Sequence, residues 1–135
     1  MAHSLTRLNP PSLPDAGAMG YSQITTVEPG KLAFISGQVA WRPGGEPVPT
    51  TLQQQAHLVA QNARAALEAI GASPQDIILA RIYLVDLTPE RMQKVMPILM
   101  ALFDGAQPCI TGVGVAALAG PDLQLEMEMT VRLGS

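Results

Sequence analysis

Residues 123–133 read Leu-Gln-Leu-Glu-Met-Glu-Met-Thr-Val-Arg-Leu, an alternation in which every odd position is apolar and every even position is polar. Successive side chains of a strand point to opposite faces of a sheet, so the pattern predicts a strand with one buried face. A sheet with helices on one face and a different environment on the other has this signature. The segment therefore predicts a sheet that is covered by helices on one side.

Two segments upstream have the spacing of helices. Apolar residues recur three and four positions apart over 52–70, which predicts an amphipathic helix. A second helix is expected over 89–103, because Thr88 is a suitable N-cap and Pro89 suits the first helical position. Pro97 predicts a kink within this helix.

The remaining elements are predicted to be strands and loops. Apolar and β-branched runs predict four further strands, at 21–27, 32–39, 77–85 and 110–115. Stretches rich in Pro and Gly predict loops at 9–20 and 41–49. The resulting order, ββαβαββ, predicts an α+β fold with two helices packed on one face of a mixed sheet. A chain of 135 residues is expected to form a single domain, 1–135.

Composition restricts the function. Charged residues make up only 14% of the chain and hydrophobic residues 47%, whereas charged residues ordinarily supply about a quarter of a soluble domain. Burial of part of the surface between copies would compensate for this deficit, so we expect a homo-oligomer. The net charge is −3 and the eight Lys and Arg residues form no cluster, which argues against nucleic acid as a partner.

The single cysteine, Cys109, excludes an internal disulfide framework and is typical of a reducing compartment. The first five residues lack the basic start and apolar run of a secretory signal. No run of eighteen apolar residues is present, so we expect no membrane span. These observations predict a cytoplasmic protein.

Two carboxylates stand out on the last strand. Glu126 and Glu128 share one face, roughly 7 Å apart at the rise of a strand. Carboxylates at this distance can perturb each other and divide acid and base roles. They can equally belong to a solvated face, and the spacing alone leaves both interpretations open.

Cys109 follows Pro108 at the start of a predicted strand. A free cysteine is most often a small buried hydrophobe, and a nucleophilic one needs a base or a positive neighbour. The two histidines, His3 and His57, lie in the N-terminal segment and on the polar side of the first helix, so a Cys–His pair is unsupported. They also provide no ligand spacing for a metal, and we expect neither metal nor cofactor.

Several short motifs occur in order through nearly the whole chain. They are Asn9-Pro10, Gly20-Tyr21-Ser22-Gln23, Phe34-Ile35-Ser36-Gly37-Gln38, Leu67-Glu68-Ala69-Ile70-Gly71-Ala72, Ile82-Tyr83-Leu84-Val85-Asp86 and Glu126-Met127-Glu128. Each motif is weak, but their order and spacing together are specific. In this combination the chain resembles the RidA family, also called the YjgF or L-PSP-endoribonuclease-like family.

The resemblance implies a chorismate-mutase-like α+β fold, a homotrimer and small-molecule clefts between neighbouring subunits. It also implies hydrolysis of reactive enamines or imines to 2-oxo acids and ammonia. Matched residue by residue, Tyr21 and the Ser36–Gly37 backbone would line the cleft, and Glu126 would position the water. Cys109 would lie in or beside the same cleft.

The chain departs from the family pattern at three positions. Ile110 stands where the family has the arginine that binds the substrate carboxylate. Met96 replaces the usual asparagine of the second helix, and Gly20 replaces the proline before the tyrosine. An isoleucine cannot pair with a carboxylate, so the resemblance implies a ligand other than the standard 2-imino acid.

Three functions remain open from the sequence. The first is a hydrolase or deaminase acting on an enamine, imine or related metabolite. The second is a non-catalytic ligand-binding or regulatory trimer. The third follows the family's older label, a ribonuclease or translation inhibitor, and the acidic balance of the chain argues against it.

Overall fold

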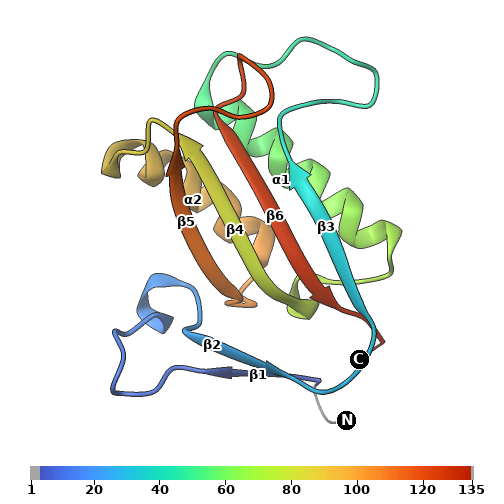
Figure 1. Ribbon diagram of the computed structural model, residues 1–135, viewed down its shortest axis with the longest axis vertical. Coiled ribbons are helices and arrows are strands. Elements are labelled where there is room, and N and C mark those ends of the chain that lie inside the picture. Colours follow the sequence, from blue (N-terminus) through green and yellow to red (C-terminus); the bar gives the residue numbers. More distant parts are fainter. Residues whose placement is uncertain (1–3, 135) are drawn as a thin grey trace.

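The computed structural model describes residues 4–134. The start of the chain, with His3 and most of the segment tested for a secretory signal, lies outside the described residues. The main sheet has four strands in the order β3-β6-β4-β5 (Figure 1). Their bounds are β3 Leu32–Gln38, β4 Ile77–Val85, β5 Cys109–Val115 and β6 Leu125–Arg132.

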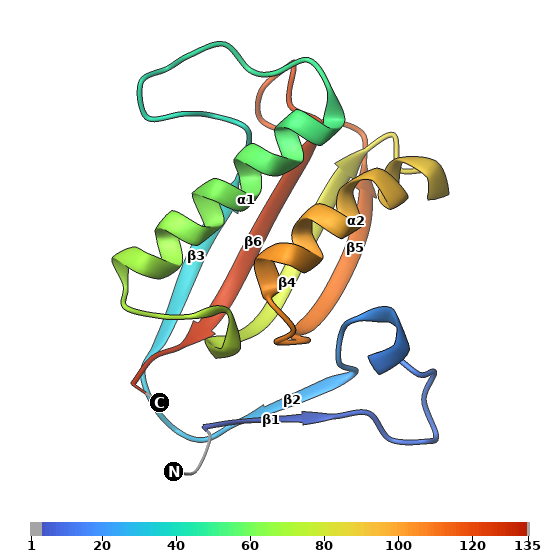
Figure 2. The ribbon, with the colours of Figure 1, turned by 180° about the vertical axis from the view of Figure 1, so that it is seen from behind.

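The sheet is mixed, as predicted. Strand β6 is antiparallel to both β3 and β4, whereas β4 and β5 run parallel. The two helices, α1 (Leu52–Ala69) and α2 (Pro89–Phe103), pack on one face of this sheet (Figure 2). The predicted α+β fold class is therefore confirmed.

The bounds of the regular elements agree closely with the periodicity of the sequence. The strand at 77–85 and the helix at 89–103 are found as predicted, and Thr88 caps α2 by accepting from the Arg91 amide at 3.2 Å. Helix α1 begins after its own cap, Thr51, whose side chain accepts from the Gln54 amide. Pro97 lies inside α2.

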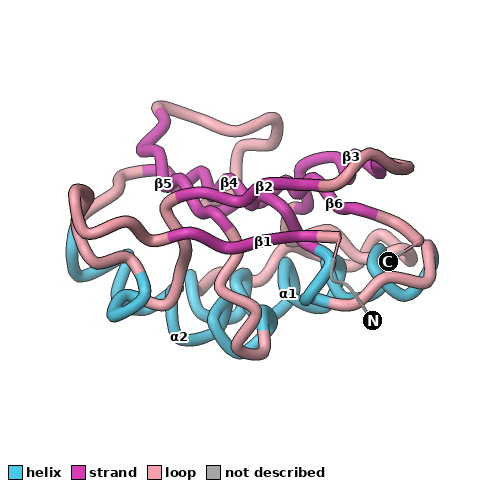
Figure 3. The backbone as a smooth tube through the Cα atoms, turned by 90° about the horizontal axis from the view of Figure 1, so that it is seen from below, coloured by secondary structure: helices cyan, strands magenta, loops and turns pink. Residues whose placement is uncertain are grey.

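One strand was not predicted. Strand β1, Leu5–Leu8, pairs antiparallel with β2, Ile24–Val27, in a separate two-stranded sheet. This ribbon lies crosswise at one end of the main sheet (Figures 1 and 3). The predicted strand at 21–27 is accordingly shorter, and Ser22 instead forms an isolated parallel bridge with Cys109 of β5.

The core lies between the main sheet and the helices. The odd-numbered side chains of β6, Leu125 through Val131, are all buried there, as the alternation of the sequence predicts. Full burial of each such side chain contributes about 1.5–3 kcal/mol. None of the helices within residues 4–134 is long and apolar enough to cross a membrane.

The other face of the main sheet carries large apolar side chains that remain exposed. Phe34 is 77% exposed, Leu32 44% and Val113 36%. Phe34 and Leu32 alternate along β3 with residues that pack against the core. This open face is therefore apolar at its β3 edge.

Gln55 is a fully buried polar side chain that links three segments of backbone. Its Nε2 donates to the carbonyls of Pro49 and Asp122, each at 2.9 Å, and its Oε1 accepts from the Gln124 amide at 2.9 Å. Helix α1 thereby holds both the loop that precedes it and the loop that leads into β6.

We predict that Gln55→Leu lowers the free energy of unfolding by roughly 2–4 kcal/mol, because three backbone groups lose their partner. Gln53→Leu is the matched control, since Gln53 is exposed on the same helix, and we expect it to change the value by less than about 0.5 kcal/mol. Chemical denaturation measures both. Equal effects of the two substitutions would contradict the role of Gln55.

Candidate functional site

Strand β3 contains a bulge at the predicted Ser36–Gly37 pair. Ile35 faces Met129 and Gln38 faces Met127, so three steps along β3 match two along β6. Bulges redirect a strand and often occur beside functional sites. The side-chain amide of Gln38 donates from Nε2 to the Ser36 carbonyl at 2.9 Å, which holds the bulge.

Glu126 lies directly against the bulge. Its carboxylate packs so closely over Gly37 that a Cβ at position 37 would collide with it, which explains the glycine. Glu126, Gly37 and Trp41 line a cavity of about 270 Å³. Within the described part of the chain, the Glu126 carboxylate makes no hydrogen bond or ion pair, and it is free to engage water or a ligand.

Glu128 has a different environment. Its carboxylate accepts a short hydrogen bond from the Tyr83 hydroxyl and forms an ion pair with Arg81, with Oε1 and Nη1 3.5 Å apart. The hydrogen bond to Glu128 is the main cause that raises the pKa of Tyr83, with burial and the nearby carboxylates adding to it. Glu128 is therefore engaged, and Glu126 is the available acid.

Sequence reasoning did not single out Tyr83 and Arg81 as partners of Glu128. They are the polar positions of an otherwise apolar strand, and the register sets Arg81 opposite Glu128 and Tyr83 opposite Glu126. Their spacing by two in a buried strand indicates that they share one face of β4. Only the pairing of β4 with β6 shows that this face meets the carboxylates of β6.

A second cavity, of about 480 Å³, lies on the helix side of β5. Tyr21 and Ile110 both line it. Four of the seven methionines also line it: Met19, Met92, Met96 and Met100. Met92, Met96 and Met100 recur every four residues along α2 and form one wall of this cavity, which we call the methionine cavity.

The three departures from the family pattern meet in or beside this cavity. Ile110 and Met96 are part of its wall. Gly20 has φ +89°, and a Cβ there would lie 2.9 Å from the Met100 sulfur, so this position favours glycine. Among the described residues, none that line the cavity carries a positive charge.

Cys109 points elsewhere. Its sulfur lies 3.2 Å from the Thr25 hydroxyl of β2, and Arg7 donates to the same hydroxyl at 3.1 Å. Cys109 is not among the residues that line the methionine cavity. The thiol is therefore held beneath the β1–β2 ribbon, half-buried.

Within one chain, the predicted site residues form two separate groups. Gly37 and Glu126 lie at the β3 side of the main sheet, with Ser36 next to them in the bulge, whereas Tyr21 and Ile110 lie at the β5 side. Strands β3 and β5 are the two edges of the sheet. A single copy does not bring the two groups together.

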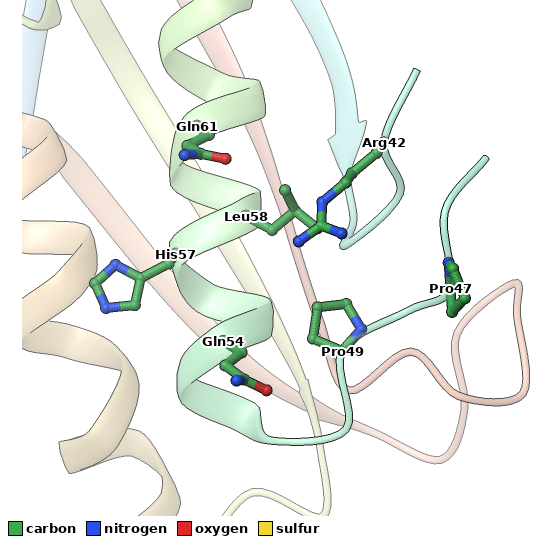
Figure 4. A pocket seen from close by; sticks show the side chains of 7 residues that line it. All are labelled: Arg42, Pro47, Pro49, Gln54, His57, Leu58 and Gln61. Carbon is green, nitrogen blue, oxygen red and sulfur yellow. The ribbon is translucent and has the colours of Figure 1, made fainter. Parts of the chain in front are cut away.

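A third hollow, of about 420 Å³, lies between α1 and the loop before it (Figure 4). Arg42 and His57 line it but extend to different sides of α1, so they do not converge on one point. No predicted site residue lies there. Within residues 4–134, no cluster of three or more His, Cys, Asp or Glu side chains could hold a metal ion.

A family model described as Endoribonuclease L-PSP matches residues 13–133, nearly the whole chain. The chain belongs to the Endoribonuclease L-PSP family. This confirms the resemblance, because relatives of the chain include a RutC family protein and a Rid family protein.

Three relatives illustrate the family. RutC family protein YjgH of Escherichia coli is 36% identical over 103 residues, which cover 75% of this chain and 76% of YjgH. The "Putative reactive intermediate deaminase TdcF" of Escherichia coli is 32% identical over 83% of this chain and 86% of TdcF. A Rid family protein of unknown function from Yersinia pestis, YyfB, has a TM-score of 0.91 at 32% identity, covering 97% of this chain and all of that one.

The Tyr83–Glu128 contact predicts a titration. In a Tyr21→Phe background, Tyr83 is the one remaining tyrosine. We expect its pKa to lie above the usual value of about 10 and to fall toward it in Glu128→Ala. Phenolate absorbance as a function of pH measures both.

The raised pKa of Tyr83 also determines how this contact changes the free energy of unfolding with pH. The stabilising contribution of Tyr83 is fully present below the pKa of about 10 that tyrosine has in the unfolded chain. It is lost as the pH rises through the higher pKa of Tyr83 in the folded chain. Glu126→Ala serves as the control and is expected to have the smaller effect, because Glu126 is the weakest cause of the shift. An unchanged titration in Glu128→Ala would contradict the contact.

Proposed function

We propose that this protein is a homotrimeric hydrolase of imines or enamines, with a cleft formed between neighbouring copies. The imine would react with water to give a carbonyl compound and ammonia. The ligand would be a small molecule that lacks the carboxylate of the standard 2-imino acid. We expect the protein in the cytoplasm and without nucleic-acid or membrane partners.

The observation that carries the proposal is the separation of the two groups of site residues. Glu126 and the Ser36–Gly37 bulge lie at one edge of the sheet, and Tyr21 and Ile110 lie at the other. Copies arranged around an axis would place the β3 edge of one against the β5 edge of the next. Such an arrangement completes the site without any movement of the chain.

The chemistry follows from the free carboxylate. Glu126 has no competing partner, so it can accept a hydrogen bond from a water molecule and remove its proton as the water adds to the C=N carbon. Tyr21 would hold the substrate from the other wall. The name of the relative TdcF, a reactive intermediate deaminase, supports this class of reaction.

Ile110 supports the choice of substrate. A carboxylate placed in the methionine cavity would be desolvated, and none of the described residues that line the cavity is a cation that could pair with it. An apolar substituent would instead displace water and contact polarizable sulfurs.

The first experiment compares hydrolysis of freshly generated 2-iminobutanoate by the native protein and by Ile110→Arg. We expect little activity of the native protein and a gain of at least about tenfold in the variant, because a guanidinium can pair with the carboxylate. Ile110→Lys tests whether planar, bidentate geometry matters. High activity of the native protein would show that another residue holds the carboxylate.

Glu126→Gln in the Ile110→Arg background separates catalysis from binding. We expect the gained activity to be lost, whereas Glu128→Gln in the same background should retain it. If no variant hydrolyses the imine and Glu126→Gln leaves ligand affinity unchanged, the protein is a non-catalytic binding or regulatory trimer. Cleavage of RNA that disappears in Glu126→Ala would favour the ribonuclease.

The oligomer is tested independently of activity. The exposed Phe34 lies on the open face of edge strand β3, where a second copy would cover it. We expect the native protein to sediment as a trimer and Phe34→Arg to sediment as a monomer. Lys31→Glu, an exposed charge change just before β3, is the control and should remain trimeric. A native monomer would contradict the shared cleft.

A further inference from the structure

Trp41 lies in the same cavity as Glu126, although no motif pointed to it. Its indole is 53% exposed, while its backbone carbonyl accepts from the Asn62 amide of α1 at 2.8 Å. The same Asn62 amide donates to Val39 at 2.9 Å. These contacts fix the segment that leaves β3, so Trp41 is a positioned aromatic group rather than a side chain of a free loop.

The indole also packs against the loop between β5 and β6. A Cβ at Gly120 would lie 3.3 Å from the Cζ2 atom of the indole and 3.1 Å from Leu123. Glycine at this position thus permits the close approach of the loop to the ring. The ring therefore lies against this loop, while about half of the residue's surface remains exposed.

The charge of the cavity is negative. Glu126 contributes a carboxylate without a partner, and none of the other described residues that line the cavity is ionisable. They are Gly37, Gln38, Val39, Trp41, Asn62, Ala119 and Leu123. The ion pair of Arg81 is made with Glu128, two residues further along β6. The cavity therefore combines a free anion with an indole side chain.

We propose that this cavity binds a small organic cation, with its protonated nitrogen placed between the Glu126 carboxylate and the Trp41 indole. A carboxylate accepts strong, charge-assisted hydrogen bonds from an ammonium or iminium group. The face of an indole attracts the same cation, and tryptophan is the best aromatic partner for it. Anions are repelled by Glu126.

As a statement about substrate, this inference rests on the proposed function. An imine nitrogen is protonated to an iminium, and the cavity would select that form through its nitrogen. The positively charged nitrogen of the ligand would then orient it in the cleft. In the standard 2-imino acid, the substrate carboxylate has this role. Trp41 is in this respect a specificity-determining residue, and Ile110 determines what the rest of the ligand can be.

Binding can be measured without any turnover. Trp41 is the single tryptophan of the chain, so its fluorescence reports on this cavity alone. The probes are cyclohexylammonium, cyclohexanol and cyclohexanecarboxylate, which share a ring and differ in charge, titrated at constant ionic strength. We expect a saturable change with cyclohexylammonium, weaker binding of cyclohexanol and no binding of the carboxylate.

Two substitutions on one strand make the matched comparison. Glu126→Gln is expected to weaken cyclohexylammonium binding by at least about tenfold. Glu128→Gln should leave it within about twofold, because Glu128 is occupied by Tyr83 and Arg81. Equal binding of ammonium and alcohol, or equal effects of the two substitutions, would overturn the proposal.

The aromatic contribution is measured by calorimetry, since substitution removes the fluorophore. Trp41→Phe should retain part of the affinity for cyclohexylammonium, and Trp41→Leu should lose more of it. An affinity unchanged in Trp41→Leu would contradict the role of the indole. Cation binding by a protein that hydrolyses no imine would refute the proposed function and leave this site standing, whereas imine hydrolysis without cation binding would refute the site.

Discussion

The amide of Gln55 is the contact on which the functional end of the domain depends. It is fully buried and satisfies three backbone groups, those of Pro49, Asp122 and Gln124. Because Gln124 immediately precedes β6, the amide determines where that strand begins and hence where Glu126 points. It also restrains the loop before α1, at Pro49. One side chain thus ties the strand that carries the acid to the loop ahead of α1, whereas the Asn62 side chain holds the backbone at Trp41.

Strong periodicity explains which parts of the fold could be predicted. The apolar spacing of the sequence predicts β4, α2 and the alternation of β6, because the regularly spaced apolar residues are those that the fold buries. Strand β1 could not be found because Leu-Thr-Arg-Leu is too short for a pattern, and its pairing with β2 stabilises it. The bulge at Ser36–Gly37 was equally hidden, since an extra residue is defined only against a partner strand.

The candidate site shows the same limit. On sequence, Glu126 and Glu128 are equivalent members of one face. In the structure Tyr83 and Arg81 engage Glu128, whereas Glu126 rests against a glycine with no partner. What separates the two acids is their cross-strand neighbours on β4, which lie more than forty residues away in the chain. Alternation alone carries no information about such neighbours, so before the register was known only the family resemblance distinguished Glu126 from Glu128.

The departures at Gly20, Met96 and Ile110 are physically consistent with one another. An asparagine at position 96 would place a polar group in this largely apolar cavity, at a cost in stability if it found no hydrogen-bond partner. Here positions 96 and 110 are both apolar, and Gly20 makes room for the sulfur of Met100. The bulge, in contrast, keeps Gly37, the glycine against which the Glu126 carboxylate packs. A cavity that is apolar at all of these positions, together with an acid that is kept free at the other edge of the sheet, argues for an altered ligand rather than for a site that has lost its function.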